Sequence, residues 1–480
     1  MNFTSLPFLL ALAVAIPITY FIPAKFKCVY LLALSYLFYF TWSVGYSLLL
    51  AATSLTTYSA ALIISNAKSD SVKKWVVAGA ISALLAVLVF FKYSEALAAI
   101  GKALTAPGLS SVLTGLVIPI GISYYLFKSI SYVLDVYWGN LEASRDVVAV
   151  SLYIAFFPQI LSGPIQRSPE FFKQISSGNF GRLDPPAFER AIGLLLLGFF
   201  EKLVVADHIG ALVHAVDAAQ STNAYLLLIG VYGYTLQLFA DFSGITHIAI
   251  GIGLFFGIEG PPNFNRPFRA NNIQEYWRGW HMSLTTWLTD YLFMPLRLAM
   301  RNMGNYGLAL SIMINMILIG IWHGDNWTFL VFGVIHGVFM ICSALTLKPR
   351  NTFFKSRPTL SRLRKVYAPI VTFHMVCLAL IFFRAPTVSS AVEVIRGIAH
   401  HQFSTKIPPS IGHDVLIPAL VAAVIAFDLG TGYLGLNRLG TLIAGTSNSS
   451  NRRWISYGTA LLIILLLAST GGGEFIYAKF

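Results

Sequence analysis

Three histidines in apolar surroundings are the residues of this sequence best suited to acid–base chemistry. His281 and His323 each follow a tryptophan, and His336 lies within an apolar run. Because the ordinary pKa of imidazole is close to neutral, a histidine can take a proton from a hydroxyl nucleophile and pass it on. Polar groups inside long apolar segments are costly, which makes them functional candidates. From spacing alone, the commoner role of such a histidine is a hydrogen bond between helices.

Metal binding is the second chemistry that these side chains suggest, and their spacing argues against it. The histidines form no HxxxH or HxxE pair, and the three cysteines are spread through apolar runs without the spacing of a metal site. The sequence also lacks a Walker-type glycine-rich loop and a GxSxG nucleophile elbow. It therefore predicts no resident metal and no bound cofactor.

The segment around His281 predicts one amphipathic helix. Asn272 followed by Glu275 resembles a capping box, so the helix is expected to begin there and to continue through Tyr291. At helical spacing an aromatic and apolar stripe runs along it, with the histidine beside the stripe: Trp277, Trp280, Leu284, Trp287 and Tyr291. Such a stripe suits the bilayer interface, where tryptophans more often anchor a helix than bind a substrate.

The segment around His323 places an imidazole at the end of an apolar span. Gly324 is expected to break the helix and to expose His323 to a cavity. Asn315 lies eight residues earlier, roughly 80° away around a helix that turns ~100° per residue. Asn315 is therefore a candidate substrate-binding group near the same cavity.

Composition decides which kind of molecule positions these residues. The chain has 480 residues, of which 56% are hydrophobic and 11% charged, against roughly 25% charged in an ordinary globular protein. A soluble fold and a disordered chain are both excluded. Apolar runs that approach the length of a spanning helix lie at 7–24, 28–44, 46–65, 75–92, 111–134, 147–162, 187–206, 223–256, 307–322, 327–346, 366–383, 415–434 and 454–469. The predicted fold is all-α, with about 11–13 transmembrane or re-entrant helices.

Basic loops orient these helices. The net charge is +13, but its densest cluster lies between two apolar stretches: Lys348, Arg350, Lys355, Arg357, Arg362, Arg364 and Lys365. This position indicates the cytoplasmic face of a membrane and contact with the lipid bilayer, not nucleic-acid binding. The same rule places the N-terminus, residues 385–414 and the C-terminus outside. We expect one membrane domain over 1–480, with a histidine-bearing core at about 230–345.

Several short motifs make the sequence resemble the membrane-bound O-acyltransferase (MBOAT) family, in particular its bacterial polysaccharide (alginate-type) O-acetylation branch. The motifs occur over nearly the whole chain, at Pro119–Tyr125, Ser131–Tyr137, Phe156–Ile160, Ser162–Arg167, Phe239–Gly244, Asn263–Phe268, Trp277–Leu284, Trp322–Gly324, Phe382–Ala385 and Glu474–Tyr477. No single motif is decisive, and their order and spacing together carry the resemblance.

The resemblance implies a fold and an activity. Members of the family form a ring of tilted helices around a central funnel, where a cytoplasmic thioester donor meets an extracytoplasmic acceptor. By motif, His323 matches the catalytic histidine of the family, and His281 matches a second histidine required in the bacterial branch. His323 would act as the general base on an acceptor hydroxyl, and His281 would orient the donor or stabilise the oxyanion.

The resemblance also implies a multi-pass acyltransferase of the bacterial cytoplasmic (inner) membrane. Its co-substrate would be acetyl-CoA or an acyl-carrier thioester, and its acceptor a cell-surface polysaccharide or an extracytoplasmic partner acetyltransferase that completes the transfer. The run Pro295–Arg301 departs from the alginate-type pattern, and the run Met294–Met303 looks more like the D-alanyl branch of the family, although the length and the ends resemble the polysaccharide acetylation branch. D-Alanyl transfer to a teichoic acid-like polymer is therefore an alternative, as are a glycan or lipid transporter and a scaffold without acyltransferase chemistry.

Overall fold

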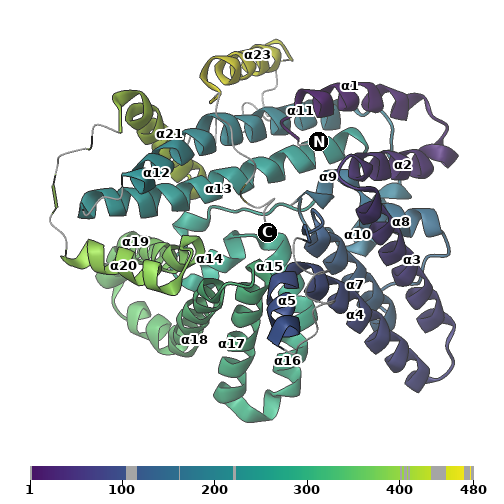
Figure 1. Cartoon of the computed structure of the whole chain (residues 1–480), viewed down its shortest axis with the longest axis horizontal. Helices are drawn as coiled ribbons and strands as arrows, with labels where there is room; N and C mark the ends of the chain where they lie inside the picture. The colour runs from purple at the N-terminus through teal and green to yellow at the C-terminus, as the bar shows by residue number, and fades with distance from the viewer. Residues whose placement is uncertain are drawn as a thin grey trace. The chain divides into compact units, whose positions relative to one another are not determined.

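The structure is a computed structural model that describes residues 3–103, 116–161, 163–219, 223–400, 403–404, 408, 411–433, 450–469 and 476. These residues form helices joined by turns and loops, with no β-strand among them, so the predicted all-α fold is confirmed (Figure 1). They divide into two compact units. Unit 1 is Met1–Leu195 with Thr246–Pro261, and unit 2 is Leu196–Ile245 with Pro262–Ala478. The single domain expected over 1–480 stays a prediction.

Unit 1 is an aromatic-rich bundle. Its elements are α1 (Leu6–Phe21), η1 (Ala24–Phe26), α2 (Lys27–Phe40), α3 (Val44–Asn66), α4 (Asp70–Lys92), α5 (Ser94–Ala103), α7 (Ile122–Trp138), α8 (Val147–Ala155), α9 (Phe157–Ile160) and α10 (Ser168–Ile175), with parts of α11 (Pro185–Phe199) and α13 (Ala224–Phe255). The long helix α3 packs against α4, α7 and α8. At the centre the ring centroid of Phe171 lies 5.4 Å from that of Tyr153 and 5.9 Å from that of Phe156, and all three side chains are fully buried. Their burial contributes to the core of this unit.

Unit 2 contains all three candidate histidines. Its elements are the remainder of α11 and α13, η2 (Phe200–Ala206), α12 (Asp207–Ala218), η3 (Pro267–Arg269), α14 (Ile273–Gly279), α15 (Met282–Leu288), η4 (Thr289–Phe293), α16 (Met294–Ala299), η5 (Arg301–Met303), α17 (Gly304–His323), α18 (Trp327–Lys355), α19 (Pro358–Arg384), α20 (Val388–His400), α21 (His413–Thr431) and α23 (Ser450–Leu467). The helices α17, α18 and α19 are consecutive, and α18 packs against both of the others. The predicted histidine-bearing core thus lies mainly in this unit.

Glycines let α17 and α18 approach closely, side by side (Figure 1). A β-carbon at Gly320 would lie 2.2 Å from the carbonyl oxygen of Phe329, and one at Gly333 would lie 2.5 Å from that of Met316. A larger side chain at either position would therefore push the helices apart. Small residues are common at such crossings in membrane proteins, where close packing joins helices in the absence of a hydrophobic driving force. The crossing fixes the end of α17, and with it His323, against α18.

Seven helices in the described part of the chain are long and apolar enough to cross a membrane. They are Val44–Asn66, Asp70–Lys92, Ala224–Phe255, Arg301–His323, Trp327–Lys355, Pro358–Arg384 and His413–Thr431, and the shorter apolar helices Leu6–Phe21, Val147–Ile160 and Trp454–Leu467 add to them. The chain is therefore a multi-pass membrane protein, as predicted. Two expected spans differ in detail, because 28–44 is largely the 14-residue helix α2 and 187–206 is α11 running into the π-helix η2.

Candidate active site

His323 is the last residue of α17, so the predicted helix break is confirmed. Gly324 is extended, and a β-carbon there would lie 2.6 Å from the ring of Phe329. His323 is only 5% exposed and packs among aromatic rings. Its ring centroid lies 4.8 Å from that of Phe383 and 6.0 Å from that of Phe332. The break therefore leaves the imidazole enclosed by aromatic side chains, and the predicted exposure of His323 to a cavity stays a prediction.

The single helix predicted around His281 is wrong, because the chain is interrupted at this residue. α14 ends at Gly279, α15 begins at Met282, and His281 has a left-handed φ of 45°. Backbone hydrogen bonds to a second segment hold the interruption, from Asn265 N–H to Gly279 O at 3.0 Å and from Met282 N–H to Asn263 O at 2.9 Å. A left-handed backbone costs a non-glycine residue on the order of 1–3 kcal/mol. The continuous aromatic stripe is therefore divided, and His281 is held at the division.

Asn263 fixes the hydrogen-bonding state of His281. Its Oδ1 accepts from Ser283 Oγ at 2.6 Å and from Ser283 N–H at 3.3 Å, which orients the amide. Nδ1 of His281 lies 3.4 Å from the same oxygen, so this nitrogen carries the proton and Nε2 is the basic nitrogen. Burial lowers the pKa of His281 to about 3, so the ring is neutral at physiological pH. No local pattern predicted this role of Asn263, although the residue opens one of the motifs that resemble those of the family.

Trp322 brings the two predicted catalytic histidines to one place. The centroid of its indole lies 4.7 Å from the ring of His323 and 6.2 Å from the ring of His281. Phe242 also contacts His281, edge to face, with centroids 4.7 Å apart. All four residues are buried. Within unit 2, His281 and His323 therefore belong to one aromatic cluster, although they come from different elements.

His336 joins α18 to α14. Its Nδ1 accepts a hydrogen bond from Trp277 Nε1 at 3.3 Å, and its ring lies 4.6 Å from Phe332, which also contacts His323. This geometry is that of a histidine bonded between helices. Trp277 is only 4% exposed, so it is a core residue. The prediction that this tryptophan anchors the helix at the bilayer interface is therefore wrong.

Asn315 lies on α17, two turns before His323, and is buried. Eight residues of α-helix rise about 12 Å, so its amide is too far from the imidazole for a direct hydrogen bond. In the part of the chain that the structure describes, no residue hydrogen-bonds its Oδ1. The assignment of Asn315 to substrate binding stays a prediction.

The capping box predicted at the start of α14 forms, with one change of partner. Asn272 is the N-cap, and its Oδ1 accepts from the N–H groups of Gln274 and Glu275 at 3.1 Å each. The Glu275 carboxylate accepts from the N–H of Asn271 at 2.9 Å, where the standard box uses the N–H of the capping residue. Burial alone would raise the pKa of Glu275, but hydrogen bonds from Asn271 and Asn272 outweigh burial and lower it.

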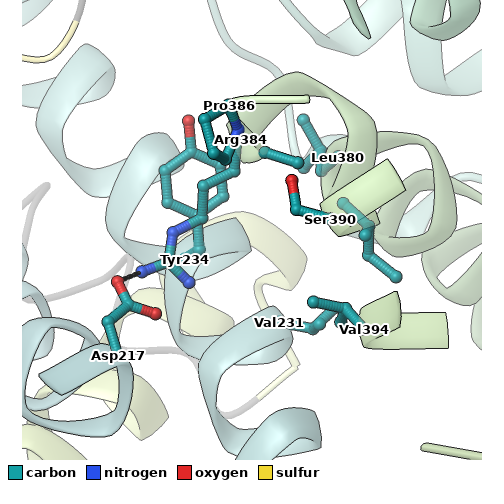
Figure 2. A pocket seen from close by; sticks show the side chains of 10 residues that line it. Asp217, Val231, Tyr234, Leu380, Arg384, Pro386, Ser390 and Val394 are labelled. Atoms are coloured by element: carbon teal, nitrogen blue, oxygen red, sulfur yellow. Dashed lines mark hydrogen bonds and ion pairs between the residues drawn. The ribbon is translucent and has the colours of Figure 1, made fainter. Parts of the chain in front are cut away.

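A pocket of about 220 Å³ lies at the C-terminal end of α19 (Figure 2). Tyr234 of α13 and Arg384 of α19 line it, and the Arg384 guanidinium forms an ion pair with Asp217. The guanidinium also lies over the Tyr234 ring, 5.2 Å from its centroid. These side chains are suited to hydrogen-bonding a hydroxyl-bearing ligand. Arg384 directly follows Phe383, the ring against which His323 packs.

A buried charge cluster contains three residues whose roles were not predicted from the sequence. Nζ of Lys202 lies 2.8 Å from Asp241 and 2.9 Å from Asp207, and the three side chains are 3%, 1% and 8% exposed. Lys202 lies in the π-helix η2, and such turns are frequent at functional sites. Asp241 directly precedes Phe242, the residue of α13 that contacts His281. Its sequence signal was charge inside apolar runs.

Comparison with known proteins identifies relatives of this chain. Residues 143–384 match the model of the membrane-bound O-acyltransferase family. The chain is 33% identical over 400 residues to the probable alginate O-acetylase of Azotobacter vinelandii, which covers 82% of this chain and 76% of the relative. It is 30% identical over 403 residues to the peptidoglycan O-acetyltransferase of Helicobacter pylori, with 78% and 74% covered. It is 32% identical over 277 residues to the teichoic acid D-alanyltransferase of Bacillus subtilis, with 55% and 68% covered.

Proposed function

The chain belongs to the membrane-bound O-acyltransferase family, and from this premise we propose that it transfers an acetyl group from a cytoplasmic thioester to a hydroxyl group on the outer side of the cytoplasmic membrane. The proposed acceptor is a cell-surface polysaccharide or a secreted partner transferase. The chain is a multi-pass membrane O-acyltransferase by its family, its relatives and its apolar helices. The donor, the acceptor and the roles of single residues are the proposal.

The position of His323 along the helices of unit 2 is the observation that carries the proposal. α18 and α19 are joined at a strongly basic turn, which extends to Lys365. At the other ends of these helices, Asn326 donates a hydrogen bond to Pro386 O at 2.6 Å. Phe383, which contacts His323, is about 27 Å from Lys365 along α19, close to the ~30 Å of the hydrocarbon core. With the basic turn in the cytoplasm, His323 lies toward the outer face, where the acceptor is.

His323 acts in this proposal as the general base. It takes the proton of the acceptor hydroxyl as the hydroxyl oxygen attacks the thioester carbonyl carbon. Collapse of the tetrahedral intermediate breaks the C–S bond, and the imidazolium returns its proton to the departing thiolate. The products are an O-acetyl ester and a free thiol. The surrounding rings, Trp322 and Phe383 among them, limit the access of water that would hydrolyse the thioester.

The hydrogen bond between His281 and Asn263 supports an orienting role for His281. Nδ1 of His281 directs its proton to Asn263 Oδ1, so Nε2 carries no proton. A nitrogen without a proton accepts hydrogen bonds and cannot donate one to an oxyanion. Of the two roles expected for His281, orientation of a substrate N–H or O–H group is therefore favoured over stabilisation of the oxyanion.

The extent of the matches favours acetyl as the acyl group. The alginate and peptidoglycan O-acetylating relatives match 82% and 78% of the chain, whereas the teichoic acid D-alanyltransferase matches 55%. D-Alanyl transfer is kept as the second candidate, because that relative is no less similar over the shared 277 residues. Family membership weighs against a transporter and against a scaffold without chemistry.

The experiment uses inside-out membrane vesicles that contain the full chain and enclose an acceptor polysaccharide. Radiolabelled acetyl-CoA is added outside, which corresponds to the cytoplasmic side, and label in the polysaccharide is measured. His323→Ala should lower the rate by about 10²- to 10⁴-fold. His374→Ala removes an exposed histidine of α19 and should keep the wild-type rate. Undiminished transfer by His323→Ala would contradict the catalytic assignment. In a parallel reaction, a radiolabelled D-alanyl carrier thioester replaces acetyl-CoA, and label in the polymer from this donor alone would favour the second candidate.

A further inference from the structure

A second pocket, of about 240 Å³, lies near the basic turn between α18 and α19, toward the other end of α19 from Arg384. Its lining includes Asn271 before α14, Ser343 and Arg350 of α18, and Arg364 of α19. The lining, as far as the structure describes it, contains no carboxylate. The nearest acid, Glu275, interacts electrostatically with both guanidinium groups, and one carboxylate against two guanidinium groups leaves the pocket with a net positive charge.

Arg350 is half-buried, and two of its guanidinium nitrogens have no acceptor among the residues that the structure describes. Its Nε and Nη2 are buried, and no residue in the described ranges accepts a hydrogen bond from either. The hydroxyl of Ser343, in the same pocket, is also buried with no hydrogen-bond partner in those ranges. Buried guanidinium donors are costly unless acceptors satisfy them. An anion in the pocket would supply those acceptors.

The nearby carboxylate of Glu275 is satisfied by other groups. Its Oε2 accepts from the N–H and from Nδ2 of Asn271, both at 2.9 Å, and its Oε1 accepts from Nδ2 of Asn272 at 2.7 Å. These bonds hold the carboxylate at the N-terminus of α14, where the helix dipole also favours it. The donors of Arg350 are therefore left for a ligand.

We propose that this pocket binds a phosphate group. A guanidinium presents paired N–H donors that match two oxygens of a phosphate, and the Ser343 hydroxyl is a further donor. The pocket is several times larger than the ~30 Å³ that a water molecule occupies in the liquid, so a phosphate fits. Two sources present this chemistry at a cytoplasmic membrane face, namely the headgroup of an anionic phospholipid and a soluble acyl donor that carries phosphate. The basic turn attracts both.

A series of ring contacts connects the pocket to His323. Phe339 lines the pocket, and its ring centroid lies 6.5 Å from that of His336. The ring of His336 lies 4.6 Å from Phe332, and Phe332 lies 6.0 Å from His323. Phe332, His336 and Phe339 are spaced three or four residues apart, so a donor held at Arg350 by its phosphate would bind on the face of α18 that also contacts the candidate base. This use of the pocket rests on the proposed function, whereas phosphate binding itself does not.

The test measures phosphate binding to the full chain in two arms. In the first, protein in phosphatidylcholine nanodiscs is titrated with desulfo-coenzyme A, a soluble probe that carries phosphate and no acyl group. In the second, thermal unfolding is compared between phosphatidylcholine nanodiscs with and without phosphatidylglycerol. Arg350→Gln removes the guanidinium, and Arg350→Lys keeps its charge without the paired donors. Arg362→Gln is the matched control, because Arg362 is exposed on the same basic turn and does not line the pocket.

Each outcome decides the proposal. A loss of about tenfold or more in desulfo-coenzyme A affinity in R350Q, with R362Q near wild type, would support the donor as the source. Stabilisation by phosphatidylglycerol that R350Q abolishes and R362Q keeps would support the lipid headgroup. Equal losses in both variants would indicate nonspecific attraction and overturn the proposal, as would no binding in either arm. If R350Q does not fold, R350K replaces it, with a similar loss expected.

Failure of this proposal is distinguishable from failure of the proposed function. His323→Ala should abolish acyl transfer and leave phosphate binding unchanged. Full acyl transfer by His323→Ala would remove the catalytic assignment while an Arg350-dependent phosphate site stood. Wild-type affinity of R350Q in both arms would remove the phosphate site while the catalytic assignment stood.

Discussion

Nδ1 of His281 and Oδ1 of Asn263 lie 3.4 Å apart, and this contact determines which ring nitrogen of His281 carries the proton. Asn263→Leu removes the acceptor at similar volume, so the ring can adopt the other tautomer. We expect acyl transfer to fall by about 10- to 100-fold, the usual effect of losing a group that orients a functional histidine. Transfer rates and the ¹⁵N chemical shifts of the His281 ring measure the two effects. Thr286→Ala, at an exposed position of α15 whose hydroxyl bonds only to backbone carbonyls of its own helix turn, is the control and should change neither quantity. An unchanged tautomer in Asn263→Leu would contradict the role of this contact.

The buried state of His281 predicts a pH dependence of stability. Burial lowers its pKa to about 3 in the folded protein, below the ordinary ~6.5 that applies when the chain unfolds. Above pH 6.5 neither state binds the proton, and below it only the unfolded state does. The free energy of unfolding should therefore fall as the pH drops below 6.5, because only the unfolded state gains the proton.

Thermal unfolding of wild type and of His281→Gln between pH 8 and pH 4 tests this dependence. Glutamine does not titrate, so the wild type should lose stability relative to the variant as the pH falls below 6.5. A difference that is independent of pH would show that the His281 pKa is not lowered. Because the ring stays neutral, we also expect no acid limb from His281 in the pH profile of acyl transfer between pH 5 and pH 8.

Close contact between α17 and α18 predicts a large effect of side-chain volume. Gly333→Leu introduces a side chain where even a β-carbon would lie 2.5 Å from Met316 O. We expect a loss of about 1–3 kcal/mol in stability from overpacking, with reduced acyl transfer because His323 shifts with the end of α17. Gly79→Leu in α4 is the control, since a β-carbon there meets nothing within 4 Å. Equal melting temperatures of the two variants would contradict the close packing.

The cluster of Lys202, Asp207 and Asp241 predicts a strong dependence on its single cation. Lys202→Met leaves two buried carboxylates uncompensated and should cost about 3–5 kcal/mol. Thermal unfolding in nanodiscs measures the loss, with Lys173→Met as the control at an exposed position. Adding Asp207→Asn and Asp241→Asn to Lys202→Met should recover part of the stability. Without such recovery, the loss would have to come from packing of the lysine stem.

Several features of this protein could be predicted because they depend on residues close together in the chain. Long apolar runs predict spanning helices, since a backbone in lipid must satisfy its own hydrogen bonds. Asn272 predicts the start of α14 and Gly324 the end of α17, because capping and helix termination are local. The motif around His323 could indicate the family because its residues are adjacent in the chain.

The sequence by itself thus determined the helical membrane fold, the family and the identity of the candidate histidines. Tertiary structure decided the rest. The interruption at His281 depends on backbone hydrogen bonds to a separate segment that begins near Asn263, and no local pattern contains them. The burial of Trp277 depends on α18, and the unsatisfied donors of Arg350 depend on what surrounds them. The tautomer of His281, the burial of Trp277 and the electrostatic potential at Arg350 depend on residues that are distant in the chain. Only the packed helices bring those residues together.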